Sequence, residues 1–339
     1  MSRVSQSFCL QPVITRRALM RAATALAPLS WMPHAAHAQA GTWPSRPLRL
    51  VVNFPPGSSP DVLARALVEP MGRALGQSVV VDNRSGASGM IGADLVAKAE
   101  PDGHVLLLTA GSTITTNPYI YARLPYDTDK DLVPVAAVAR IALFLVCRAD
   151  LPVRDVGEFI AYLKAHPGRL SYGSAGNGTG LHLAGELFKR DGGVQALHVP
   201  FRGASPALQA LLAGQIDFMF DPGIAMSHVR AGRLRMLAVA VPQRSAAFPQ
   251  VPTLDEAGLA AFDAGTTHGV YAPAGVPAQI LARVHHEVNR ALASEPVRAQ
   301  IAAIGAEPSP LSVTQFAAQM ARDSERYGAI VRERHIRVD

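Results

Sequence analysis

The sequence is poor in cysteine, and this excludes several kinds of structure and chemistry. Its 339 residues include two cysteines, Cys9 and Cys147. Cys9 lies in a segment that we expect to be removed, so the mature chain has no internal disulfide and depends on its core for stability. Cys147 ends the apolar run Ile141-Ala-Leu-Phe-Leu-Val-Cys147, which favours a buried small hydrophobic residue over a nucleophile.

Long apolar runs and a strong charge imbalance are also missing. No run of about 18 apolar residues is present to span a bilayer. With 49% hydrophobic and 17% charged residues, the composition is typical of a globular protein with room for two domains. The formal charge is +6, and residues 1–38 carry four arginines and no acidic residue, so their removal lowers it by four to +2. Without a basic stripe that contains aromatic residues, nucleic acid is not an expected partner.

Several sequence signatures of enzymes are absent. The chain has no Gly-x-Ser-x-Gly turn, no Gly-x-x-x-x-Gly-Lys-Ser/Thr loop, no Cys-x-x-Cys and no His-Glu-x-x-His. Gly176-Asn-Gly178 resembles the start of a dinucleotide fingerprint, but the third glycine is residue 180 rather than 181. We therefore expect no catalytic residue, no metal and no cofactor. An oxidoreductase that is exported with a bound nucleotide cofactor remains the alternative.

The N-terminus has the features of a targeting segment rather than of a folded element. The pair Arg16-Arg17 precedes a mildly apolar run over residues 22–32, and small residues end at Ala38. We predict a signal peptide over residues 1–38, cleavage after Ala38, and a mature protein in the periplasm. The arginine pair indicates the twin-arginine route, although ordinary secretory signals also carry such pairs.

The stretch Tyr172-Gly-Ser-Ala-Gly-Asn-Gly-Thr-Gly180 is the strongest candidate for a binding loop. It runs from an expected strand into an expected helix over residues 181–190. Its glycines let a ligand approach the main chain, because no Cβ stands in the way. The helix adds unpaired N–H groups and the positive end of its dipole, so a carboxylate or phosphate is the expected ligand. A connecting turn without a ligand is the alternative for a single loop of this kind.

The same order of strand, loop and helix recurs, which favours the binding interpretation. Ligands of open α/β sheets lie beyond the carboxyl ends of the strands, where such loops meet. The other loops follow expected strands at residues 48–54, 105–109 and 216–220, and they read Pro55-Pro-Gly-Ser-Ser-Pro-Asp61, Ala110-Gly-Ser-Thr113 and Asp221-Pro-Gly.

Strand and helix patterns alternate along the mature chain, which predicts parallel sheets covered by helices on both faces. The first half places strands at residues 48–54, 78–82 and 105–109, and helices at 61–75 and 91–99. The second half places strands at 170–172, 196–201, 216–220 and 234–241, and helices at 156–165, 181–190 and 206–212. We expect the apolar runs 133–148 and 266–273 to cross between two lobes, and helices at 277–294, 296–304 and 312–335 to pack on the first lobe.

Short sequence blocks spread over the mature chain carry a family resemblance. They include Phe54-Pro-Pro-Gly, Val81-Asp-Asn-Arg84, Leu124-Pro-Tyr-Asp127, Tyr172-Gly-Ser-Ala-Gly-Asn-Gly-Thr179, His198-Val-Pro-Phe-Arg-Gly203 and Val251-Pro-Thr253. In this order they resemble the Bug-type receptors of tripartite tricarboxylate transporters. The resemblance covers essentially the whole mature chain.

The resemblance implies a two-lobed α/β periplasmic binding protein of the type II, or Venus-flytrap, class with two hinge crossings. Residues 39–143 and 266–339 would form lobe 1 and residues 144–265 lobe 2, each with a mostly parallel sheet flanked by helices. Such a receptor closes over a small organic carboxylate and hands it to an inner-membrane permease, or alternatively to a sensor. We expect a monomer that binds the acid without altering it.

Carried over position by position, the resemblance implies a ligand site shared between the lobes. The expected residues are Pro56, Gly57, Ser58, Ser59, Gly111 and Ser112 on lobe 1, with Ser174, Gly176, Asn177, Gly178, Thr179, Arg202 and a rim residue, Asp221, on lobe 2. Arg202 would offer its guanidinium to a second carboxylate, and a solvated or interlobe arginine is the alternative. His182 is expected to be a surface or satisfied core histidine rather than a ligand contact.

One loop departs from the family pattern. The family usually reads Pro-Pro-Gly-Gly-Gly-Thr-Asp where this chain has Pro55-Pro-Gly-Ser-Ser-Pro-Asp61. We expect Ser59 to be the N-cap of the next helix and Pro60 its first residue. The two serine hydroxyls can replace a water or narrow the site, and Pro60 removes an N–H donor. No particular substrate is therefore carried over from the family.

Overall fold

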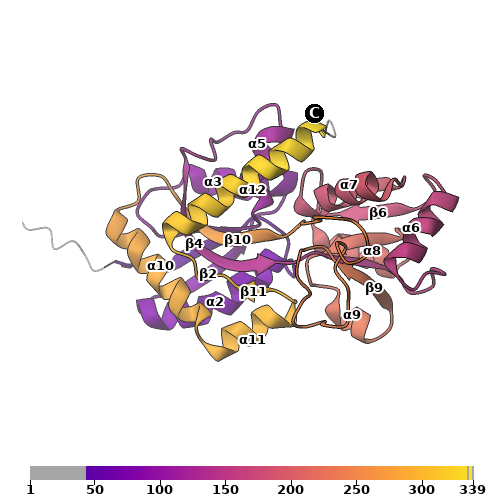
Figure 1. The fold of residues 1–339 in the computed structure, drawn as a ribbon. Helices are drawn as coiled ribbons and strands as arrows, with labels where there is room; N and C mark the ends of the chain where they lie inside the picture. The colour runs from indigo at the N-terminus through magenta and orange to yellow at the C-terminus, as the bar shows by residue number, and fades with distance from the viewer. Residues whose placement is uncertain (1–42, 334–335, 338–339) are drawn as a thin grey trace, which may run out of the picture. The chain divides into compact units, whose positions relative to one another are not determined.

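The computed structural model describes residues 43–333, 336 and 337. The predicted signal peptide and its cleavage site lie outside the described residues. The described elements build two mixed β-sheets with helices on their faces (Figure 1). Within this part of the chain, no helix combines the length and the apolar character that a membrane span requires.

The first sheet joins strands from both ends of the described chain. Its six strands lie in the order β11-β4-β10-β3-β1-β2. β1, β2 and β3 pair in parallel, whereas β10, β4 and β11 join by antiparallel pairing. The bounds are β1 (Leu48–Val52), β2 (Val79–Asn83), β3 (Val105–Thr109), β4 (Leu132–Ile141), β10 (Thr266–Pro273) and β11 (Glu307–Pro308).

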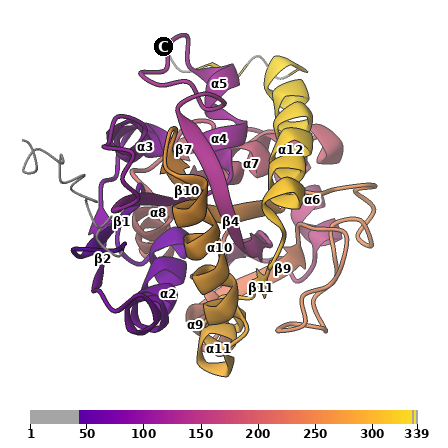
Figure 2. The same cartoon turned by 90° about the vertical axis from the view of Figure 1, so that its left-hand side faces the viewer.

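Both faces of the first sheet are buried under helices, which explains why its strands are apolar throughout. Successive side chains point to opposite faces, so Leu50 and Val52 join one buried cluster and Val51 joins another. One face is covered by α2 (Ser59–Leu75), α10 (Ala278–Leu292) and α11 (Glu295–Ala303), and the other by α3 (Met90–Ala97) and α12 (Val313–Glu333) (Figure 2). Short helical turns follow β2 and β3: η1 (Ala87–Gly89), α4 (Ser112–Thr115) and α5 (Asn117–Ile120).

The second sheet is built from the middle of the chain. Its order is β7-β6-β8-β5-β9, with β7, β6 and β8 parallel and β5 antiparallel to both of its neighbours. Tyr172 packs against Gly185 of α7 and Gly173 against Ala207 of α8, so these two helices cover opposite faces. The bounds are β5 (Phe144–Arg148), β6 (Ser171–Ser174), β7 (Leu197–Pro200), β8 (Phe218–Asp221), β9 (Leu234–Val239), α6 (Val156–Ala165), α7 (Gly180–Gly192), α8 (Ala204–Leu212) and α9 (Met226–Arg230).

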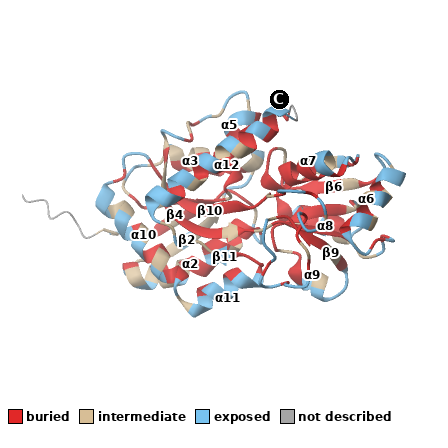
Figure 3. Ribbon diagram, viewed as in Figure 1, coloured by how far each residue is buried: buried red, intermediate tan, exposed pale blue. Residues whose placement is uncertain are grey.

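The predicted two-lobed α/β fold is confirmed, but each sheet is mixed rather than mostly parallel. The apolar run 133–148 is divided at Ala142 and Leu143 into β4 of the first sheet and β5 of the second. β4 and β5 do not pair with each other: β4 pairs antiparallel with β10, and β5 pairs antiparallel with β8 and β9. The centres of both sheets are buried (Figure 3).

Candidate ligand-binding site between the two sheets

The loop between β1 and α2 is fixed by hydrogen bonds among its own residues. The Ser58 hydroxyl donates to the Pro55 carbonyl oxygen at 2.6 Å, and the Gly57 N–H donates to Asp61 Oδ2 at 2.8 Å. Ser58 is the N-cap of α2, and Ser59 is the first helical residue. The helix therefore starts one residue earlier than expected, because Ser58 already has the extended backbone of a cap while its hydroxyl holds the loop.

Asp61 is buried at the start of α2, but its charge is compensated. Its carboxylate accepts hydrogen bonds from the Gly57 N–H, from Arg65 Nε at 2.9 Å and from Asn83 Nδ2 at 3.0 Å. Burial works to raise the pKa of Asp61, but the hydrogen bonds from Arg65, Gly57 and Asn83 together outweigh it and lower the pKa. The ionised carboxylate thus organises the loop and does not line the cavity described below.

Thr179 and His182 hold the glycine-rich loop between β6 and α7. Thr179 is the N-cap of α7 and donates its hydroxyl hydrogen to the Gly176 carbonyl oxygen at 2.7 Å. The Nδ1 atom of His182 accepts the Gly178 N–H at 2.9 Å, and burial lowers the pKa of this histidine to about 4. His182 is therefore a satisfied core histidine, as the sequence analysis favoured.

β10 brings two polar residues to the first loop from far along the chain. His268 Nε2 lies 3.0 Å from the Ser59 hydroxyl oxygen. Burial lowers the pKa of His268 to about 3, so the ring is neutral near pH 7. His268 Nδ1 and Thr266 Oγ1 are buried and have no hydrogen-bond partner among the described residues. Such atoms are uncommon in folded proteins, and here they point to a place where a ligand or water is received.

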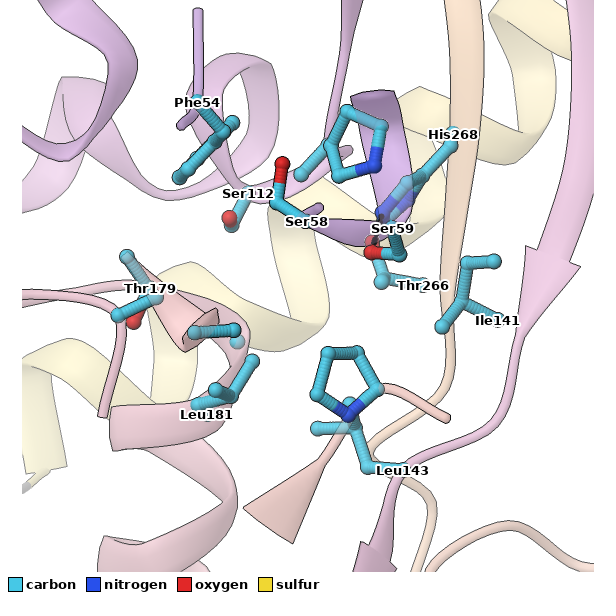
Figure 4. A pocket seen from close by; sticks show the side chains of 16 residues that line it. Phe54, Ser58, Ser59, Ser112, Ile141, Leu143, Thr179, Leu181, Thr266 and His268 are labelled. Atoms are coloured by element: carbon cyan, nitrogen blue, oxygen red, sulfur yellow. Dashed lines mark hydrogen bonds between the residues drawn. The ribbon is translucent and has the colours of Figure 1, made fainter. Parts of the chain in front are cut away.

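These loops enclose a cavity between the two sheets, which we call the interlobe cavity. Its polar side chains are Ser58, Ser59, Ser112, Thr179, Thr266 and His268. The cavity volume is about 30 Å³, which is room for roughly two water molecules. Ser58, Ser59, Ser112 and Thr266 lie on the side of the first sheet, and Leu181 and Leu143 face them (Figure 4). An organic ligand therefore requires the surrounding loops to move apart before it can enter.

The interlobe cavity contains polar side chains but no charged ones. No Asp, Glu, Lys or Arg is among the described residues that line it, and His268 is neutral. A hydroxyl that donates its hydrogen elsewhere presents only lone pairs to a ligand, and this applies to Ser58 and Thr179. The Ser112 and Thr266 hydroxyls, with the first-turn N–H groups of α2 and α7, remain as donors for an anion.

A second cavity, which we call the Arg202 cavity, adjoins the first. It has a volume of about 180 Å³ and is lined by residues 85–89 after β2 and by Gly176, Asn177 and Arg202, among others. Phe54 and Ala175 line both cavities and separate them. Arg202 therefore lies beside the interlobe cavity and not in it.

Direct contacts join the loops of the two sheets. The Ser88 hydroxyl donates to the Asn177 carbonyl oxygen at 2.7 Å, and the Ser205 hydroxyl donates to the Pro56 carbonyl oxygen at 3.4 Å. Gly178 approaches Ile120 so closely that a Cβ at this position would lie 1.8 Å from Ile120 Cδ1. The lobes are thus closed against each other at the site.

The structure distributes the predicted ligand residues over two cavities and their supporting loops. Ser58, Ser59, Ser112 and Thr179 meet in the interlobe cavity, and Gly176, Asn177 and Arg202 line the Arg202 cavity. The other predicted residues line neither of these two cavities: Pro56, Gly57, Gly111, Ser174, Gly178 and Asp221. Ser174, for example, contacts His198 Nε2 at 2.7 Å, so its side chain supports the loop from behind.

Asp221 is fully buried rather than at the rim of the site. Its Oδ2 accepts the Gly223 N–H at 2.7 Å and the Ala225 N–H at 3.0 Å. Burial raises the pKa of Asp221 to about 7 despite these hydrogen bonds. The carboxyl group shapes the turn after β8, and the next residue, Pro222, is the one that lines the interlobe cavity.

Sequence reasoning missed several residues that line the interlobe cavity. They are Ile141, Leu143, Thr266 and His268 at the two crossings, together with Leu181 in the first turn of α7 and Pro222 in the loop after β8. The sequence contains a signal for the four residues at the crossings, because the runs 133–148 and 266–273 were expected to cross between the lobes. Segments that cross a two-lobed protein pass beside its cleft, and their polar members are candidates for the site.

Comparisons with known proteins agree with this architecture. The family model described as a tripartite tricarboxylate transporter family receptor matches residues 63–336. A UPF0065 protein in the tcbD-tcbE intergenic region of Pseudomonas sp. strain P51 is 39% identical over 293 residues, covering 86% of this chain and 87% of the relative. BugT of Bordetella pertussis is 37% identical over 302 residues, covering 88% and 92%.

Solved structures are similar over nearly the whole described chain. Rpa4515 of R. palustris, solved with adipate, is 33% identical with a TM-score of 0.83, covering 86% of this chain and 97% of that one. MatC of Rhodopseudomonas palustris, with bound malate, is 34% identical with a TM-score of 0.81, covering 85% and 100%. The periplasmic binding protein BugD is 30% identical with a TM-score of 0.83, covering 87% and 99%. The family and these neighbours are substrate-binding receptors, so the oxidoreductase alternative is not retained.

Proposed function

The chain belongs to the tripartite tricarboxylate transporter receptor family, and from this premise we propose that it captures a small organic carboxylate between its two lobes. It then delivers the acid to a membrane permease of the tripartite tricarboxylate type. The two structural neighbours that were solved with adipate and malate support the class of ligand.

One observation carries the proposal: uncharged donors from both lobes converge on a single cavity. The first lobe supplies the Ser112 and Thr266 hydroxyls and the start of α2, and the second supplies the start of α7. Helix starts favour negative groups because of their free N–H groups and their dipole. A ligand that touches both lobes favours the closed arrangement, since only there are all its contacts made.

Thermal unfolding against a panel of acids tests capture. Each carboxylic acid is compared with its primary amide, which has nearly the same shape without the charge, and with neutral sugars. We expect at least one acid to raise the unfolding temperature while its amide does not. A ligand at 100 times its dissociation constant stabilises by about 2.7 kcal/mol. Stabilisation by amides or sugars but by no acid contradicts capture of an anion.

Delivery requires a separate measurement, because capture alone also fits a protein that feeds a sensor. Cells or proteoliposomes that contain a permease of this transporter class are supplied with the labelled acid, with and without the purified mature chain. We expect uptake to depend on the chain. Uptake that is unchanged by the chain, for an acid that it binds, favours the sensor as partner.

We also infer that the protein works in the periplasm after residues 1–38 are removed. The support is the pair Arg16-Arg17, the apolar run after it and the small residues that end at Ala38. N-terminal sequencing of the exported protein tests this, with Gln39 as the expected first residue. Replacing both arginines by lysine separates the routes, because the twin-arginine route requires the pair and ordinary secretion does not.

A further inference from the structure

Most of the wall of the interlobe cavity is apolar. Ile141 and Leu143 enter from the crossing between β4 and β5, Leu181 from the first turn of α7, and Pro222 from the loop after β8. Phe54 adds an aromatic ring from the loop after β1. A ligand must place carbon against these side chains, because a charged group would lose its hydration there without gaining a partner.

The interlobe cavity as a whole is small. Its volume of about 30 Å³ holds roughly two waters, which is close to the space of the two oxygens of one carboxylate, so the body of a ligand fits only when the side chains around the cavity move apart. The free hydroxyl donors, Ser112 and Thr266, lie on the side of the first sheet, and Leu143 and Leu181 lie opposite (Figure 4). No cation among the described lining residues is available to a second carboxylate.

Building on the proposed function, we propose that the ligand is a monocarboxylic acid with an apolar aliphatic or aromatic body. Its single carboxylate meets the Ser112 and Thr266 hydroxyls and the first-turn N–H groups. Its body packs against Ile141, Leu143 and Leu181, which move apart to admit it. This differs from the structural neighbours solved with adipate and malate, which both carry two carboxylates.

The Arg202 cavity offers the rival arrangement. A diacid long enough to pass Phe54 and Ala175 would place its second carboxylate near the Arg202 guanidinium. Phe54 would have to swing out of the partition for this to happen, which would expose its ring and give up its packing. The buried side chain of Phe54 therefore favours the monocarboxylate. A substitution of Arg202 distinguishes the two arrangements, because only the diacid would contact its guanidinium.

Isothermal titration calorimetry with matched acid pairs tests the inference. The pairs are butyrate and succinate, hexanoate and adipate, and benzoate and terephthalate, so that partners differ by a second carboxylate on the same body. The pair built on the acid that performs best in the thermal panel is added to them. Each acid is titrated into the wild-type mature chain and into the variant Arg202→Gln, whose side chain is on the surface.

We expect the monocarboxylate to bind at least tenfold more tightly than its diacid in every pair that binds, with Arg202→Gln changing neither affinity by more than twofold. Equal or tighter binding of the diacid overturns the inference and leaves carboxylate capture standing. If Arg202→Gln then weakens the diacid tenfold or more, the Arg202 cavity holds the second carboxylate. If no acid of either kind binds, the proposed function itself fails.

Discussion

Hydroxyl groups that line the interlobe cavity differ in what they offer a ligand. Ser58 gives its hydrogen to the Pro55 carbonyl at 2.6 Å, so it can only accept a hydrogen bond from a ligand. Ser112 has no hydrogen-bond partner for its hydroxyl within the described chain and lies in the same cavity. The same argument removes Thr179 from the set of anion donors, because its hydrogen is directed at Gly176.

Removing the Ser112 hydroxyl should therefore affect binding more than stability. We expect Ser112→Ala to weaken carboxylate binding five- to tenfold, about 1 kcal/mol, with the unfolding free energy of the ligand-free protein nearly unchanged. Ser58→Ala is the matched control, since it should cost about 1 kcal/mol of stability and affect binding less. Calorimetric titration and urea unfolding of both variants check this, and the reverse pattern would show that Ser58 is the donor.

Asp221 should give the protein a stability that depends on pH. Its pKa is raised from 3.8 to about 7 in the folded state, chiefly by burial. The folded protein therefore holds this proton more tightly, and the resulting stability is complete below about pH 4 and is lost as pH rises to about 7. Asp221→Asn lacks this dependence, so we expect it to gain on the order of 3 kcal/mol relative to wild type between pH 5 and pH 8. Urea unfolding of both proteins at pH 5 and at pH 8 measures this. A stability difference between variant and wild type that is the same at both pH values contradicts it.

At this scale the sequence predicted residue types better than their contacts. The hydroxyls of Ser58, Ser59, Ser112 and Thr179 lie in loops that a local strand–loop–helix pattern marked, and the family resemblance then implied the individual residues. Thr266 and His268 were marked only as parts of an expected crossing. Their place beside Ser59 depends on pairing of β10 with β3 and β4 across a distance of more than a hundred residues.

At the scale of elements, the glycine-rich loop between β6 and α7 forms a surface against which the first lobe packs when the lobes are closed. Gly178 has φ of +73° and lies where any Cβ would overlap Ile120 of α5. Gly168 has a similar φ of +69°, but a Cβ there meets nothing within 4 Å. The two positions share the cost of a left-handed backbone, and of the two only Gly178 lies against the other lobe.

Substituting the two glycines should separate closure from backbone strain. We expect Gly178→Ala and Gly168→Ala each to lower the unfolding free energy by about 1 kcal/mol. Only Gly178→Ala should also weaken ligand binding, by tenfold or more, because its methyl group holds the lobes apart at Ile120. Titration calorimetry with the best acid checks this. If Gly168→Ala loses as much affinity as Gly178→Ala, loop strain and not closure is responsible.

Element boundaries were predictable where the signal was local. The strands before the binding loops begin and end close to their expected residues, because glycine, proline and serine mark the turns after them. The apolar run 133–148 was expected to cross between the lobes, but its hydrophobicity does not show that the chain leaves one sheet and enters the other at Ala142 and Leu143. The start of α2 moved by one residue because Ser58 and Ser59 are both capable N-caps.

At the scale of the whole molecule, two connections and a few bridges hold the lobes in register. The second crossing is fixed to the first lobe by α12, where Arg326 Nη2 and the Tyr327 hydroxyl donate to the Gly265 carbonyl oxygen at 3.0 and 2.9 Å. The family resemblance predicted both lobes, but not that they would be closed. Whether the lobes are closed depends on a small free-energy difference between the open and closed states. No local sequence pattern encodes the interlobe contacts that set this difference.

The ion pair between Arg190 of α7 and Glu333 of α12 tests that balance, because it joins the two lobes at 2.9 Å. An interaction made only in the closed state adds to ligand affinity, although an exposed pair contributes only about 0.2–1 kcal/mol. We expect Glu333→Gln to weaken binding two- to threefold at low salt and to have no effect near 0.5 M salt, where the pair is screened. The control is Glu158→Gln, which removes the partner of Arg154 within the second lobe. A loss that persists at high salt, or appears equally in the control, would mean that the pair takes no part in closure.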